Sequence, residues 1–83
     1  MNDTPNYYRL PESLQEGMRL YIEDRVETGG FLRAVLSNDL RTACERADAE
    51  NQRALFDIVA WIYNNAPSNC WGSTAAVAAW IAR

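Results

Sequence analysis

Cys44 and Cys70 are the strongest nucleophiles in this sequence, which contains no histidine. A catalytic cysteine needs a general base or a positive environment to form its thiolate. The basic residues nearest to Cys70 along the chain are Arg53 and Arg83, so no base is adjacent in sequence. We therefore predict structural roles for both cysteines, with Cys44 as a small core residue. A thiol enzyme that uses Cys70 is the alternative, and our prediction is that the protein is not an enzyme.

Pairs of carboxylates can act as a general acid and a general base, but the spacing of the carboxylates in this sequence predicts a solvated helix face. Glu12, Glu16 and the pair Glu23 and Asp24 lie within one amphipathic segment, whereas a catalytic carboxylate pair needs burial to separate its pKa values. Two thiols without histidine cannot cage a structural zinc ion. The glycine pair at 29–30 lacks the third glycine and the lysine of a phosphate-binding loop. The sequence thus predicts no metal site and no cofactor.

The composition indicates a small helical domain with a slight acidic excess. The chain has 83 residues, a hydrophobic fraction of 48% and a net charge of −3, which suits one core and disfavours direct nucleic-acid binding. No apolar run approaches the roughly 18 residues that span a bilayer, and the N-terminus shows no signal-peptide pattern. We expect a flexible segment over residues 1–9, a single helical domain over residues 10–83, and a cytoplasmic protein that does not bind membranes.

Apolar residues recur at helical spacing in four segments, and no strand pattern competes. The predicted fold is all-α, a compact bundle of four short helices over about residues 11–27, 31–46, 49–65 and 74–82. Glycines 29–30 are expected to end the first helix with positive φ. The polar run 37–39 leaves open whether the second helix breaks, and we favour a continuous helix. Asp48 and Ser73 are predicted N-caps.

One face of the first predicted helix carries an acidic stripe, and this stripe is the candidate partner-binding surface. Its carboxylates recur at helical spacing on the side opposite the apolar residues. The candidate contact residues are Glu12, Glu16, Arg19, Leu20, Glu23 and Glu27. Leu20 borders the stripe, and Trp61 lies off the apolar face of its own helix, so both are expected to be exposed. Exposed apolar side chains there would support a weak homodimer, which leaves monomer and weak dimer as alternatives.

A turn over residues 66–73 contains Cys70, Trp71 and Gly72 and precedes the last helix. We expect Trp71 to pack against the end of the bundle, the alternative being a stacking platform for a base. This turn's Cys-Trp-Gly-Ser block occurs together with a Gly-Gly-Phe-Leu block at 29–32 and Leu-Pro-Glu-Ser-Leu at 10–14. The combination resembles a family of small proteins encoded by tailed phages and prophages, and it covers about residues 10–82. The resemblance supplies no catalytic residue.

The resemblance implies a protein that acts on a host system, because small acidic phage proteins are frequently inhibitors of host defences. With the acidic stripe, it implies an anti-CRISPR protein in the host cytoplasm that binds a subunit of a CRISPR effector complex and blocks target-DNA binding. The alternative is a phage protein that modulates another host defence, a polymerase or a nuclease. The stretch 24–28 is more charged than the family pattern, which implies specialisation for a partner.

Overall fold

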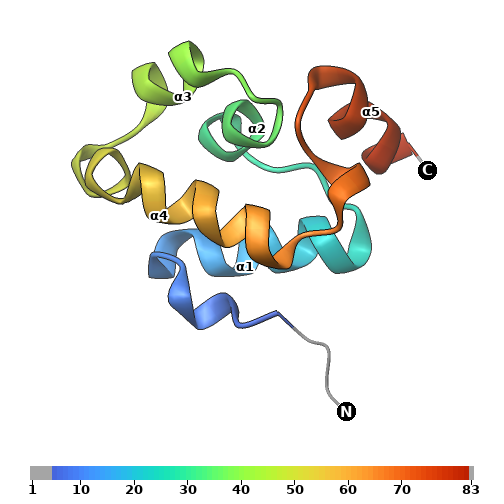
Figure 1. Cartoon of the computed structure of the whole chain (residues 1–83), viewed down its shortest axis with the longest axis horizontal. Coiled ribbons are helices and arrows are strands. Elements are labelled where there is room, and N and C mark those ends of the chain that lie inside the picture. Colours follow the sequence, from blue (N-terminus) through green and yellow to red (C-terminus); the bar gives the residue numbers. More distant parts are fainter. Residues whose placement is uncertain (1–4, 83) are drawn as a thin grey trace.

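The computed structural model describes residues 5–82 and contains helices but no strand in that range (Figure 1). The five α-helices are α1 (Glu12–Asp24), α2 (Gly30–Leu36), α3 (Leu40–Arg46), α4 (Ala49–Asn65) and α5 (Thr74–Ala82). Two short 3-10 turns, η1 (Tyr7–Arg9) and η2 (Ser68–Cys70), complete the described chain. The all-α class is confirmed, with five helices in place of four. No helix within residues 5–82 has the length and apolar character needed to cross a membrane.

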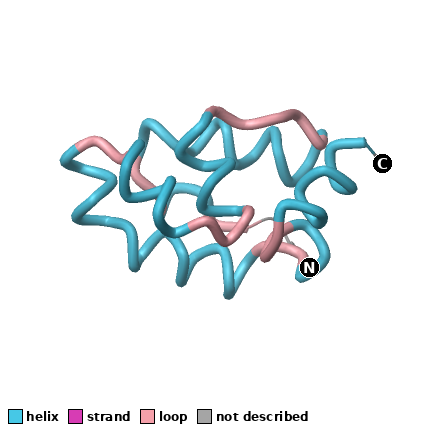
Figure 2. Tube along the Cα trace, turned by 90° about the horizontal axis from the view of Figure 1, so that it is seen from above, coloured by secondary structure: helices cyan, strands magenta, loops and turns pink. Residues whose placement is uncertain are grey.

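The helices surround one core to which α1, α2, α4 and α5 all contribute. Figure 1 shows α4 lying along α1, with η1 below them and α2, α3 and α5 on the other side. In the view turned by 90°, helical turns make up most of the trace and the loops are short (Figure 2). The largest side chains that are fully buried are Tyr21, Met18, Leu36, Ile58, Ile62, Val77 and Cys70. Burial of such apolar surface is the main stabilising contribution to a domain of this size.

The first helix ends at Asp24, three residues before the predicted end, and Arg25 rather than a glycine ends it. Arg25 adopts the left-handed conformation with φ 58°, and the amide of Val26 donates to the carbonyl of Leu20 at 3.2 Å. The amide of Arg25 itself donates to the carbonyl of Tyr21 at 3.1 Å, which is the αL type of helix cap. The guanidinium of Arg25 lies 3.7 Å from the ring centroid of Trp80, and this cation–π contact favours the unusual backbone conformation.

The expected continuous helix over residues 31–46 is wrong, because the chain breaks between α2 and α3. Asn38 has φ 62°, and the amide of Asp39 donates to the carbonyl of Ala34 at 2.9 Å. The Asp39 side chain then accepts a hydrogen bond from the amide of Thr42 at 3.2 Å and caps α3. Asparagine tolerates the left-handed region and aspartate is a strong N-cap, so adjacent residues stop one helix and start the next.

The predicted caps of the two C-terminal helices are confirmed. The Asp48 side chain accepts from the amide of Asn51 at 2.8 Å at the start of α4. The Ser73 hydroxyl accepts from the amide of Ala76 at 3.0 Å at the start of α5. Each cap satisfies an amide that has no partner inside its own helix.

The expected exposure of Trp61 is wrong, and the N-terminal segment explains why. Trp61 is only 5% exposed, and its Nε1 donates to the backbone carbonyl of Asn6 at 3.0 Å. The rings of Tyr7 and Trp61 are 5.4 Å apart. Residues 5–9, expected to be part of a flexible segment, therefore pack against α4, while residues 1–4 of that segment lie outside the described residues.

Candidate functional site

Cys70 does not have the environment of a reactive thiol. Its side chain is fully buried, and burial raises the pKa of the Cys70 thiol to about 11, so the thiolate is scarce at neutral pH. Cys44, expected in the core, is instead exposed on α3. Among residues 5–82, no group of three or more His, Cys, Asp or Glu side chains is placed to hold a metal ion.

The turn over residues 66–73 is a structural corner that links α4 to α5 and is hydrogen-bonded to α1 and α2. The hydroxyl of Tyr21 on α1 donates to the carbonyl of Cys70 at 2.6 Å. The amide of Gly72 donates to the carbonyl of Leu36 at the end of α2 at 2.7 Å. Gly72 has φ 111°, a conformation that favours glycine. Trp71 is half-buried and packs against the core, in agreement with the predicted packing.

The exposed side of α1 carries a charge excess that equals the net charge of the whole protein. The helix contains four carboxylates and one arginine, a formal charge of −3. The whole chain also has a net charge of −3, so the seven acidic and seven basic residues outside α1 cancel. We call Glu12, Glu16, Arg19, Leu20 and Glu23 the acidic face of α1. These residues carry a formal charge of −2, and Asp24 supplies the remaining negative charge of the helix. Glu12, Glu16 and Glu23 are exposed, whereas Arg19 and Leu20 are half-buried.

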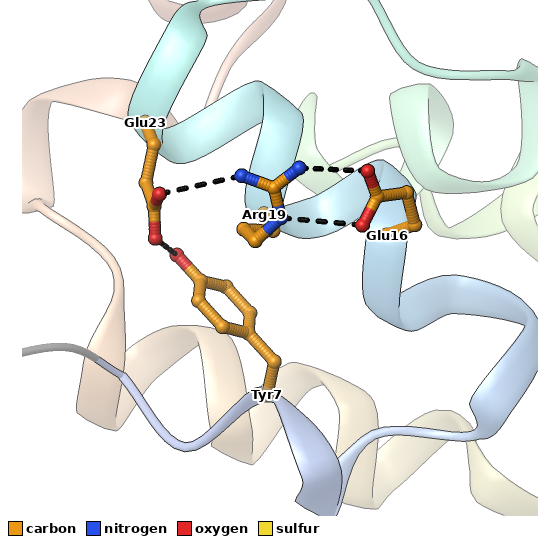
Figure 3. A network of polar contacts seen from close by, with 4 residues as sticks. All are labelled: Tyr7, Glu16, Arg19 and Glu23. Carbon is orange, nitrogen blue, oxygen red and sulfur yellow. Dashed lines mark hydrogen bonds and ion pairs between the residues drawn. The ribbon is translucent and has the colours of Figure 1, made fainter.

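Arg19 organises two of these carboxylates into a network (Figure 3). Its Nη2 lies 2.7 Å from Glu16 Oε2 and its Nη1 lies 3.5 Å from Glu23 Oε1. The Arg19 Nε also donates to Glu16 Oε1 at 3.2 Å, which makes that pair bidentate. On the far side, the hydroxyl of Tyr7 donates to Glu23 Oε2 at 3.1 Å. The network holds the carboxylates of Glu16 and Glu23 in defined positions.

The ionisation of the network follows from these contacts. The hydrogen bond from Arg19 holds the pKa of Glu16 below its ordinary value, and the same pair raises the pKa of Arg19. Burial, and then the hydrogen bond to Glu23, raises the pKa of Tyr7. At neutral pH Glu16 is therefore a carboxylate, Arg19 a cation and Tyr7 a neutral hydrogen-bond donor.

The structure separates Glu27 from the other predicted contact residues. Glu27 follows the left-handed turn at Arg25 and so does not continue the face of α1. Its carboxylate pairs with Arg33 of α2 at 2.5 Å. The acidic stripe was expected to extend to Glu27, but it ends at Glu23 because α1 ends at Asp24.

Tyr7 is a member of the network that the sequence did not reveal. It lies nine residues before Glu16 and outside the predicted helix, and only the fold of the N-terminal segment brings it to Glu23. An aromatic pair at positions 7–8 in an otherwise polar segment is the signal that marks an anchored segment.

Comparison of the chain with protein-family models, with curated proteins and with solved structures found no match. The resemblance to a phage protein family therefore stays a prediction from the sequence blocks at 10–14, 29–32 and 70–73.

Proposed function

We propose that this protein is a phage-encoded anti-CRISPR inhibitor that binds a CRISPR effector complex in the host cytoplasm and blocks target-DNA binding. The acidic face of α1 is the binding surface, and no catalytic step is involved. The observation that supports this proposal is that α1 alone accounts for the net charge of −3. A CRISPR effector holds its nucleic acids in a positively charged channel, which such a face complements.

The helix dipole does not account for the carboxylates in the last turn of α1. Glu23 and Asp24 stand in the last turn, where the helix dipole disfavours negative charge, and this turn contains no basic residue. Glu12, in the first turn, is the carboxylate that the dipole favours. Carboxylates at positions that the helix dipole disfavours are consistent with a role in binding cationic side chains of a partner rather than in stabilising α1.

The charge density of α1 is too low to imitate double-stranded DNA, and it indicates competition with DNA for a small number of basic side chains on the effector. Thirteen residues span about 20 Å at ~1.5 Å per residue, so three net charges correspond to roughly one per 6–7 Å. Double-stranded DNA carries about one charge per 1.7 Å. The face therefore competes for a few basic side chains and gains association rate from charge. Half-buried Leu20 supplies an apolar contact at its edge.

The proposal is tested by measuring target-DNA binding of purified effectors from candidate hosts in the presence of the protein. Wild-type protein is expected to abolish DNA binding, and Glu16→Lys/Glu23→Lys is expected to lose inhibition because it reverses the anchored carboxylates. The matched control is Glu45→Lys/Glu50→Lys, which changes the net charge equally at exposed positions outside α1. Circular dichroism should show that both variants remain helical.

Full DNA binding by every effector at saturating wild-type protein would refute the proposal. Equal loss of inhibition in both double variants would show that net charge, rather than the acidic face of α1, is responsible. Capture of polymerase or nuclease subunits from host lysate, in place of CRISPR subunits, would favour the alternative of a phage protein that modulates another host target.

A further inference from the structure

The solvent-facing side of α4 presents two large aromatic rings that no other part of the described chain covers. Phe56 is 80% exposed and Tyr63 is 75% exposed. They are seven residues apart, so they lie two turns apart on the same side of the helix. We define the outer face of α4 by its exposed and half-buried residues at helical spacing, which are Ala49, Gln52, Arg53, Phe56, Asp57, Ala60 and Tyr63.

An apolar hollow borders this outer face. It lies between α4 and the α2–α3 region and is lined by Leu40, Leu55, Val59 and Trp71, among others. Leu40 is itself 64% exposed at its rim. Exposed aromatic rings beside an apolar hollow form one continuous apolar surface on this side of the molecule, and a surface of this kind marks an interaction site.

The charges of the outer face are also self-complementary. Arg53 and Asp57 are the charged residues that define the face, and exposed Glu50 and Arg9 lie at its border, so the positive and negative charges balance. The ion pairs of the described residues include neither Arg53 nor Asp57. In an antiparallel pair of α4 helices related by a two-fold axis near position 55, Arg53 of each copy faces Asp57 of the other. The same axis brings the two Phe56 rings close together and places Tyr63 near Ala47 of the second copy, just before the start of α4.

The exposed area fits a weak dimer. A fully exposed aromatic side chain presents roughly 150–250 Å², so Phe56 and Tyr63 at 80% and 75% exposure offer about 300 Å² per copy. A stable interface needs about 800 Å² per partner, and weak ones bury less than about 600 Å² each. The area offered by the two rings is therefore within the range of weak interfaces and below that of stable ones.

We propose that the outer face of α4 is a two-fold interface between two copies of this chain. The neutral charge of this face distinguishes it from the acidic face of α1, where a second copy would be repelled. The interface does not depend on the proposed inhibitory function, because it uses different residues on a different helix.

Sedimentation velocity over about 1–500 µM protein tests the interface, with a dissociation constant of about 10–100 µM expected. Phe56→Ala should raise that constant at least about tenfold, as for a central aromatic contact. Tyr8→Ala is the matched control, because Tyr8 is 74% exposed but lies on η1, and it should leave the constant unchanged.

A charge swap tests the two-fold arrangement. Arg53→Asp and Asp57→Arg should each weaken the dimer, and the double variant Arg53→Asp/Asp57→Arg should restore it, because each swapped side chain again meets an opposite charge. A protein that stays monomeric up to 500 µM, or a dimer that Phe56→Ala leaves intact, would overturn the proposal. Failure of the double variant to restore a dimer weakened by both single variants would overturn the antiparallel geometry.

Discussion

The hydrogen bond between Tyr21 and Cys70 joins α1 to the turn over residues 66–73, and its removal tests how much this contact stabilises the fold. Tyr21 is 0% exposed, and its hydroxyl donates to the Cys70 carbonyl at 2.6 Å. Tyr21→Phe deletes the donor but keeps the ring, including its contact with Trp80 at 6.4 Å between centroids. The variant thus isolates one hydrogen bond at the junction of α1 and the 66–73 turn.

The expected cost follows from burial of the acceptor. Cys70 is also 0% exposed, so water cannot replace the lost donor without opening the corner. An unsatisfied buried carbonyl costs about 1–3 kcal/mol. For a domain of this size, each ~1 kcal/mol lowers Tm by roughly 4–8 °C, so the variant should melt at least about 4 °C below wild type.

Urea and thermal unfolding followed by far-UV circular dichroism provide the assay. Tyr63→Phe is the matched control, since it removes the same hydroxyl from a side chain that is 75% exposed, and its effect should stay within about 0.5 kcal/mol. If Tyr21→Phe is as stable as wild type, the corner does not depend on this hydrogen bond and the reasoning fails. A large loss of stability in the Tyr63→Phe control would also contradict the explanation by burial.

Three further predictions concern thiol reactivity, backbone conformation and pH. In the folded protein Cys44 should react with iodoacetamide well before Cys70, which is buried with a pKa raised to about 11; mass spectrometry of digests measures both. Gly72→Ala should lower the free energy of unfolding by about 1 kcal/mol or more, because φ is 111° there; urea unfolding measures it. The contacts of Glu16 with Arg19 and of Asp39 with Thr42 lower the pKa values of both carboxyl groups. The free energy of unfolding should therefore hold above about pH 4.5 and fall as the pH drops further. Urea unfolding from pH 6 to 2 measures this, and the free energy of unfolding should depend less on pH in Glu16→Gln and Asp39→Asn.

Much of the fold could be predicted from the sequence because its local signals agree. Apolar spacing placed the helices, and Asp48 and Ser73 were recognisable caps of α4 and α5. The core positions Met18, Ile58 and Val77 follow the same spacing and are buried. These features depend on residues close together in sequence.

The misplaced end of α1 and the unexpected burial of Trp61 depend on contacts between distant residues, whereas the missed break between α2 and α3 comes from the adjacent residues Asn38 and Asp39. Arg25 adopts a left-handed conformation next to Trp80, 55 residues away, although a glycine pair nearby offered a conventional cap. Trp61 is buried because residues 6–7 cover it. Such contacts cannot be read from helical periodicity.

For the candidate site, the sequence identified the carboxylates but not their organisation. Glu16, Arg19 and Glu23 lie together as expected from their spacing. Glu27 was assigned to the same face because the early end of α1 was not foreseen, and Tyr7 was missed because it joins the network through tertiary structure.

The most direct test of the central claim is whether the protein and target DNA exclude each other on one effector. Immobilised protein is exposed to a purified CRISPR effector, either free or already loaded with target DNA, and the captured effector is quantified. Our proposal predicts capture of the free effector, loss of capture after DNA loading, and no capture by Glu16→Lys/Glu23→Lys. Equal capture of free and DNA-loaded effector would contradict competition for the DNA path.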